Sequence, residues 1–199
     1  MSKTILCLCF SCLLVLPHNN WELLRDEDRI KLYTRKVTGS KIKEVKAETT
    51  FNAPLEDLEI IFRNVEGYKQ WFDECLVSEQ LAEIDTNNVY GRFVIRVPFP
   101  FQNRDVVAKL NFKKVDAQTF QVTLTNKPNY IPKKRRLIRT PHFESKWTFK
   151  SMDNNTKTKT VMTLHANMGG YIPTWAINSA TKWGPFLSIK KLRNLVETE

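Results

Sequence analysis

The sequence predicts an α+β domain in which a curved antiparallel sheet packs against one long C-terminal helix. Several segments alternate apolar and polar residues, as strands with one buried face do. Two segments have helical periodicity instead, at about 54–67 and 173–197. Because the strands follow one another and the helices stand apart from them, the order favours α+β over an alternating α/β arrangement.

Strand alternation is the clearest pattern in the chain. In the first such segment, Val45, Ala47 and Phe51 alternate with Lys46 and Glu48. This pattern suits an antiparallel sheet that is covered on one side only. Polar turn residues separate several of the segments. The segments are 45–51, 92–97, 106–113, 120–125 and 161–168.

The two helices have recognisable ends. Pro54 suits a first helical turn, Glu56 and Asp57 suit the positive end of the helix dipole, and Gly67 is expected to close the segment. The second helix runs from about Pro173 to Glu197, and Pro185 inside it predicts a kink. If this helix and the sheet do not meet closely, a cavity remains between them.

Length and composition indicate one ordinary globular domain. The chain has 199 residues, of which 42% are hydrophobic and 26% charged, so it can bury a sizeable core. Its formal net charge of +10 favours a partner with a negative surface, either an anionic membrane or nucleic acid. No nucleic-acid-binding motif accompanies the charge. We therefore expect transient contact with an anionic membrane, no nucleic-acid partner and a monomer.

The N-terminus has the pattern of a secretory signal peptide. Lys3 precedes an apolar run from Ile5 to Leu16, and Pro17 and polar residues follow it. The run is too short to span a bilayer, which needs roughly 20 apolar residues. We expect residues 1–20 to be a signal peptide, residues 21–199 to be the domain, and the protein to be exported to a periplasm or secreted. A buried N-terminal helix in a cytoplasmic protein is the alternative.

Reactive side chains do not form a recognised catalytic or metal-binding pattern. Three of the four cysteines lie in the N-terminal segment, which leaves Cys75 without a disulfide partner. His142 and His165 have neither H-E-x-x-H spacing nor paired cysteines near them. We expect no catalytic residue, no metal and no cofactor.

Several motifs together resemble one family. They are Pro98-Phe-Pro100 followed by Arg104-Asp105, Arg139 followed by Trp147-Thr-Phe, and Gly169-Gly-Tyr-Ile-Pro-x-Trp-x-x-Asn178. Their order and spacing resemble the START (StAR-related lipid-transfer) domain family, in particular its bacterial single-domain members. The matches span about Trp21 to Leu195.

The resemblance implies a helix-grip fold with an internal hydrophobic cavity for one lipid or sterol-like ligand, capped by the C-terminal helix. The protein is then expected to bind and transfer lipid and not to be an enzyme. An aromatase/cyclase-like enzyme of the same superfamily is the alternative. Leu110 stands where cholesterol-carrying members have a second arginine, which puts sterol specificity in doubt. The candidate ligand-binding residues are Phe93, Ile95, Arg104, Asp105, Leu110, Trp147, Met168, Trp175, Asn178 and Trp183.

Three groups of residues have competing interpretations. Arg104 and Asp105 either reach the ligand or stabilise loops and strand ends. The basic cluster Lys133, Lys134, Arg135 and Arg136 either contacts lipid phosphates or is a solvated loop. Trp175, Trp183 and Phe186 are expected to close the cavity as part of a movable helix, with lipid entry through loops near Pro98 to Gln102 as the alternative.

Overall fold

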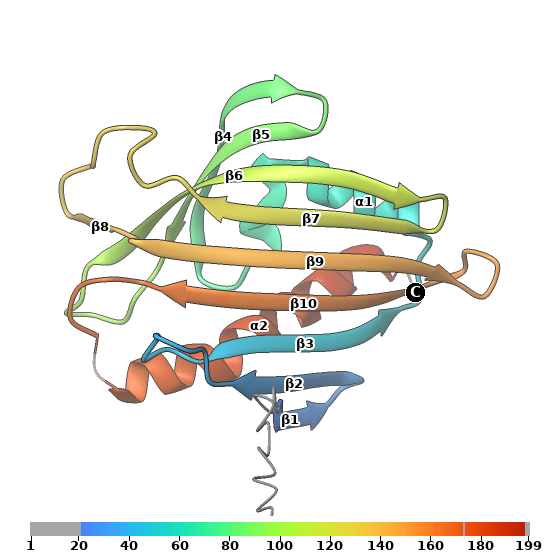
Figure 1. Cartoon of the computed structure of the whole chain (residues 1–199), viewed down its shortest axis with the longest axis horizontal. Coiled ribbons are helices and arrows are strands. Elements are labelled where there is room, and N and C mark those ends of the chain that lie inside the picture. The colour runs from blue at the N-terminus through green and yellow to red at the C-terminus, as the bar shows by residue number, and fades with distance from the viewer. Residues whose placement is uncertain (1–20, 173, 198–199) are drawn as a thin grey trace, which may run out of the picture.

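The computed structural model describes residues 21–172 and 174–197, and one curved, open sheet of ten strands dominates it (Figure 1). The strand order is β1-β2-β3-β10-β9-β7-β6-β5-β4, with antiparallel neighbours, and the short β8 pairs parallel with β6. The strands are β1 (Glu22–Glu27), β2 (Ile30–Arg35), β3 (Glu44–Phe51), β4 (Cys75–Asp85), β5 (Asn88–Ile95), β6 (Asn103–Asp116), β7 (Thr119–Asn126), β8 (Leu137–Arg139), β9 (His142–Met152) and β10 (Lys157–Asn167).

The predicted alternation is confirmed where a strand has one buried face. In β3 the buried residues are Val45, Ala47, Thr49 and Phe51, and in β7 they are Phe120, Val122 and Leu124. Strand β4 was not predicted as a strand. It lies at the edge of the sheet, and most of its residues are half-buried or exposed, so no regular apolar pattern marks it.

Both predicted helices exist, but the end of the first was wrong. Helix α1 (Leu55–Arg63) stops at Asn64 and not at Gly67, because a 3-10 helix, η1 (Val65–Gln70), follows it directly. The Asn64 side chain accepts a hydrogen bond of 3.2 Å from the Gly67 backbone nitrogen. Helix α2 (Thr174–Val196) continues on both sides of Pro185, and the kink expected there stays a prediction. No described helix is long and apolar enough to cross a membrane.

Helices α1 and α2 lie on the same face of the sheet (Figure 1), which we call the inner face. From α2, Phe186, Ile189 and Leu192 are buried against it, and from α1, Leu58 and Phe62 are buried. Phe62 lies at the centre of an aromatic cluster, with its ring centroid 4.9 Å from Trp71, 5.0 Å from Trp147 and 4.8 Å from Phe149. The helix-grip arrangement expected from the sequence is therefore the observed one.

Candidate ligand-binding site

Three of the predicted ligand residues lie together in the buried part of the inner face. Phe93 on β5 and Leu110 on β6 are fully buried, and Trp147 on β9 is nearly so. The Phe93 ring stacks on Tyr68 of η1 with a centroid distance of 5.5 Å. These side chains belong to the buried apolar core between the sheet and the helices.

Other apolar side chains pack against this core but remain partly exposed. Ile95 at the end of β5 and Met168 after β10 were predicted as ligand residues and belong to this group. Both therefore pack on the core without being fully covered by the described residues. Sequence reasoning did not place the remaining members at the site, although two continue the alternation of β10. The additional members of this group are Ile61, Phe72, Leu164, Ala166 and Leu187.

Arg104 is fully buried, and its guanidinium group donates hydrogen bonds to backbone carbonyls of the protein itself. Its Nη2 donates to the Gly169 carbonyl at 2.8 Å, its Nε to the Met168 carbonyl at 3.3 Å, and its Nη1 to the Gln102 carbonyl. The Met168 and Gly169 carbonyls lie at the turn through Gly169 and Gly170, both of which have positive φ. Arg104 therefore fixes the segment that leads into α2.

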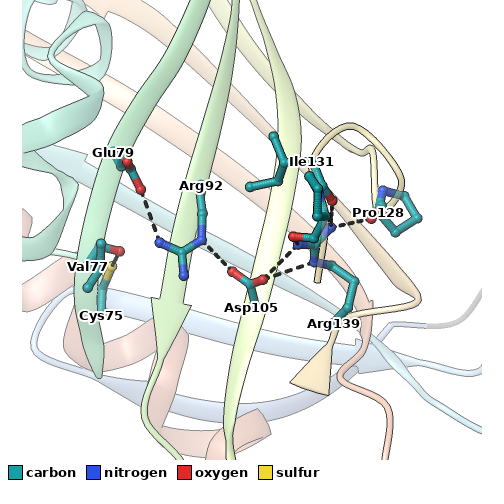
Figure 2. Close-up of polar contacts among 9 residues, drawn as sticks. Cys75, Val77, Glu79, Arg92, Asp105, Pro128, Ile131 and Arg139 are labelled. Carbon is teal, nitrogen blue, oxygen red and sulfur yellow. Dashed lines mark hydrogen bonds and ion pairs between the residues drawn. The ribbon is translucent and has the colours of Figure 1, made fainter. Parts of the chain in front are cut away.

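Asp105 has its side chain on the opposite, outer face of the sheet, as alternation along a strand requires. Figure 2 shows its carboxylate between two arginines, with Arg92 Nε 2.7 Å from Oδ1 and Arg139 Nη2 2.9 Å from Oδ2. Arg92 also pairs with Glu79 at 3.1 Å. The structure thus places Asp105 in a buried ionic network and away from Phe93 and Leu110.

The same network holds the loop that carries the basic cluster. Arg139 donates to the carbonyls of Pro128, Ile131 and Pro132, with the last two at 3.0 and 3.1 Å (Figure 2). Lys133 to Arg136 follow directly and are all exposed. Their side chains are therefore solvated, but the loop beneath them is anchored.

An exposed aromatic surface lies beside this loop. Strand β8 follows the basic cluster and pairs with Asn103–Asp105, which places the cluster next to the loop 98–102. In that loop Phe99 is 95% exposed, and Tyr171, whose ring centroid is 6.2 Å from Phe101, is 79% exposed. We call Phe99, Phe101, Tyr171 and Lys133–Arg136 the aromatic–basic face. Phe99 and Tyr171 occur in the family motifs, but neither was predicted as a membrane contact.

Trp183 on α2 makes a cation–π contact with Arg25, a residue that was not predicted to belong to the site. The Arg25 guanidinium on β1 lies 3.9 Å from the centroid of the Trp183 ring and 3.7 Å from that of Phe186. Trp183 is half-exposed, whereas Phe186 is buried. The other two predicted residues of this helix, Trp175 and Asn178, lie outside the described side chains.

Burial moves the pKa values of two titratable groups near the interior further above neutral pH. Burial raises the pKa of the Cys75 thiol to about 12 and raises the pKa of the Tyr68 hydroxyl as well. His142 and His165 contact each other, with Nε2 and Nδ1 3.0 Å apart, on the outer face. Within residues 21–172 and 174–197, His, Cys, Asp and Glu do not form a group that could hold a metal ion. A polar pocket of about 420 Å³ lies elsewhere, between α1 and β4, and contains none of the predicted ligand residues.

Comparison with known families agrees with this architecture, because the START domain model matches residues 13–198. The chain belongs to the START domain family. Uncharacterized protein PA1579 of Pseudomonas aeruginosa is 29% identical over 178 residues, which cover 89% of this chain and 87% of that protein. The phosphatidylcholine transfer protein of Bos taurus is 27% identical over 170 residues, or 82% of this chain and 78% of that protein.

A comparison with solved structures also finds a STAR-related lipid transfer protein. The crystal structure of a STAR-related lipid transfer protein from Xanthomonas axonopodis superposes with a TM-score of 0.79 at 29% sequence identity. The match covers 87% of this chain and 97% of that one. Membership of the START family and its lipid-transfer relatives supports lipid binding or transfer as the general role of this chain.

Proposed function

We propose that this START domain binds one lipid between the inner face and the first half of α2, and carries it between membranes without changing it chemically. The observation behind this proposal is the half-buried apolar group Ile95, Leu164, Ala166 and Met168, which packs against the buried core. An acyl chain laid on this surface would remove more apolar area from water, at about 25 cal/mol per Å².

The lack of turnover rests on the chemistry of the interior. The thiol of Cys75 and the hydroxyl of Tyr68 stay protonated at neutral pH, and Arg104 already donates to backbone carbonyls. An aromatase/cyclase-like enzyme would need an acid or base that changes its protonation near the operating pH. The described inner face offers no carboxylate or histidine beside Phe93 and Leu110.

Native mass spectrometry of the purified chain tests the proposal. After incubation with a total lipid extract, we expect one lipid mass per protein chain and a raised melting temperature, because a ligand that binds only the folded state stabilises it. A chain that takes up no lipid from the extract would contradict the proposal. Reproducible conversion of the bound lipid into a new species would instead favour the enzymatic alternative.

Two further parts of the proposal concern where the protein acts: at the membrane surface and outside the cytoplasm. We propose that the aromatic–basic face contacts anionic membranes and that the protein acts there as a monomer. We also propose export, on the basis of residues 1–20, which lie outside the described residues. Sequencing the N-terminus of the protein from its native cell tests export, and a cytosolic chain that starts at Met1 or Ser2 would refute it.

A further inference from the structure

We propose that the polar group of the bound lipid is an uncharged hydroxyl, and that Asn126 and Thr140 hold it. This inference rests on the proposed function, since it specifies which lipids the same site accepts. It comes from two buried polar atoms on the inner face and from the arrangement of charge around them.

The position of Asn126 follows from strand alternation and register. It continues the inner-face series Phe120, Val122 and Leu124 of β7, and its backbone pairs with Ala108 on β6. On the other side of β7 lies β9, where Thr125 pairs with Glu144. One residue further, the same register brings Phe143 opposite Asn126, and Phe143 pairs in turn with Ala166 of β10. Asn126 is therefore flanked by Ala108 on one side and Phe143 on the other, with Ala166 one strand beyond Phe143.

Thr140 lies in the neighbouring row. Its backbone nitrogen donates to the Asp105 carbonyl at 3.0 Å, so the parallel register of β8 with β6 continues one residue further, beside Val106. Val106 in turn pairs with Phe93, a predicted ligand residue. The two polar residues are joined, because Asn126 Nδ2 donates to the Thr140 carbonyl at 3.2 Å.

Both side chains have hydrogen-bonding capacity that the described protein does not use. The Thr140 side chain is fully buried, and neither its Oγ1 nor the buried Oδ1 of Asn126 has a partner among the described residues. A buried polar group without a partner is costly, so such atoms in a binding protein are candidate ligand contacts. One is an acceptor and the other both donates and accepts, which matches a hydroxyl group on the ligand.

The charge around this pair argues against a phosphate. Arg104 is the buried cation of the described inner sheet face, and its guanidinium is occupied by the carbonyls of Gln102, Met168 and Gly169. The sequence 173–179, at the start of α2, contains neither lysine nor arginine. A phosphate brought to Asn126 and Thr140 would thus lose its hydration without gaining a free cation.

Extraction of lipids from phosphatidylcholine vesicles by the full chain tests this inference. The vesicles carry either dioleoylglycerol or cholesterol as the free alcohol, mixed with an equal amount of the corresponding O-methyl ether. Protein is separated from the vesicles, and its bound lipids are identified by mass spectrometry. The ether keeps the apolar body of each lipid and removes only the hydroxyl donor, and the two alcohols distinguish a glycerolipid from a sterol.

We expect wild-type protein to take at least one alcohol about five- to tenfold in preference to its ether. Thr140→Val and Asn126→Leu should bring this ratio close to one. Thr160→Val is the matched control, because Thr160 Oγ1 is also buried without a partner but lies on β10 next to Thr49 of β3. This control should keep the wild-type ratio.

The wild-type ratio tests the inference even if a variant does not fold. Equal uptake of alcohol and ether by wild-type protein would overturn it, as would preferential uptake of the vesicle phosphatidylcholine. Both results leave lipid binding itself intact. Equal ratios for Thr140→Val and Thr160→Val would also overturn the role of Thr140. Uptake of no lipid at all contradicts the proposed function together with this inference.

Discussion

Arg139 donates two hydrogen bonds to one carboxylate oxygen of Asp105, from Nε at 3.0 Å and from Nη2 at 2.9 Å. This pair joins β8 to β6 and anchors the loop before β8 on the outer face. Its neighbour Arg104 fixes the segment before α2 on the inner face. Adjacent residues of one strand thus position two of the three segments that form the aromatic–basic face, although neither side chain is exposed there.

Asp105→Asn should destabilise the protein by about 3 kcal/mol, because removing one partner of a buried ion pair leaves uncompensated charge. Arg139 would lose its carboxylate partner, and Arg92 would keep only the partly exposed Glu79. Urea unfolding followed by tryptophan fluorescence measures the change. Glu79→Gln is the control, since Glu79 is partly exposed and should contribute under about 1 kcal/mol. Equal stability of the two variants would show that the buried network does not stabilise the fold.

Replacing Lys133, Lys134, Arg135 and Arg136 by alanine should weaken binding to anionic vesicles, with an effect that shrinks as salt rises. The Debye length falls from about 10 Å at 0.1 M salt to about 3 Å at 1 M, so exposed charges lose their attraction. Vesicle co-sedimentation at several salt concentrations measures the binding. The control variant replaces four other lysines by alanine and so removes the same amount of charge. They lie on β6, β9 and β10, near the strand ends opposite the basic cluster: Lys113, Lys114, Lys150 and Lys159. Equal loss in both variants would indicate a general charge effect and no specific face.

Arg25→Gln should speed lipid exchange by loosening the first half of α2. The guanidinium contact with Trp183 and Phe186 contributes about 1 kcal/mol at a partly exposed site. Transfer of a fluorescent lipid between vesicles gives the rate. Arg29→Gln serves as the control, because Arg29 pairs with Glu197, just beyond the other end of α2. If exchange is unchanged in Arg25→Gln, the first half of α2 does not limit it, and entry through the loop 98–102 is favoured.

Gly170→Ala should destabilise the protein by about 1–2 kcal/mol. Gly170 has a φ of 63°, which disfavours a side chain, and an added Cβ would lie 2.6 Å from Ile138 Cδ1. Gly184→Ala should instead raise the free energy of unfolding by about 0.5 kcal/mol, since alanine favours a helix and an added Cβ meets nothing within 4 Å. Thermal unfolding compares them. A neutral Gly170→Ala would mean that the turn before α2 adapts to a side chain.

The sequence by itself determined the class of fold and much of the buried inner face. Alternation in a strand reports which side chains are apolar on one face, so Phe93 and Leu110 could be assigned correctly to the interior, and the family motif added Trp147. The alternation did not reveal β4, because few residues of this edge strand are buried and its sequence therefore lacks a regular apolar pattern. The prediction also ended α1 at Gly67, because the turn at Asn64 that starts the 3-10 helix η1 depends on a local hydrogen bond from Gly67 N to the Asn64 side chain.

The roles of the polar residues were decided only by the tertiary structure. Alternation placed Arg104 and Asp105 on opposite faces, but their partners come from distant segments, Gly169 for one and Arg139 for the other. The same holds for Arg25 on Trp183, and for Asn126 beside Thr140. Apolar burial depends mainly on the local pattern of one strand or helix. A hydrogen bond or ion pair depends on two atoms within about 3 Å of each other, and only the folded chain fixes that distance.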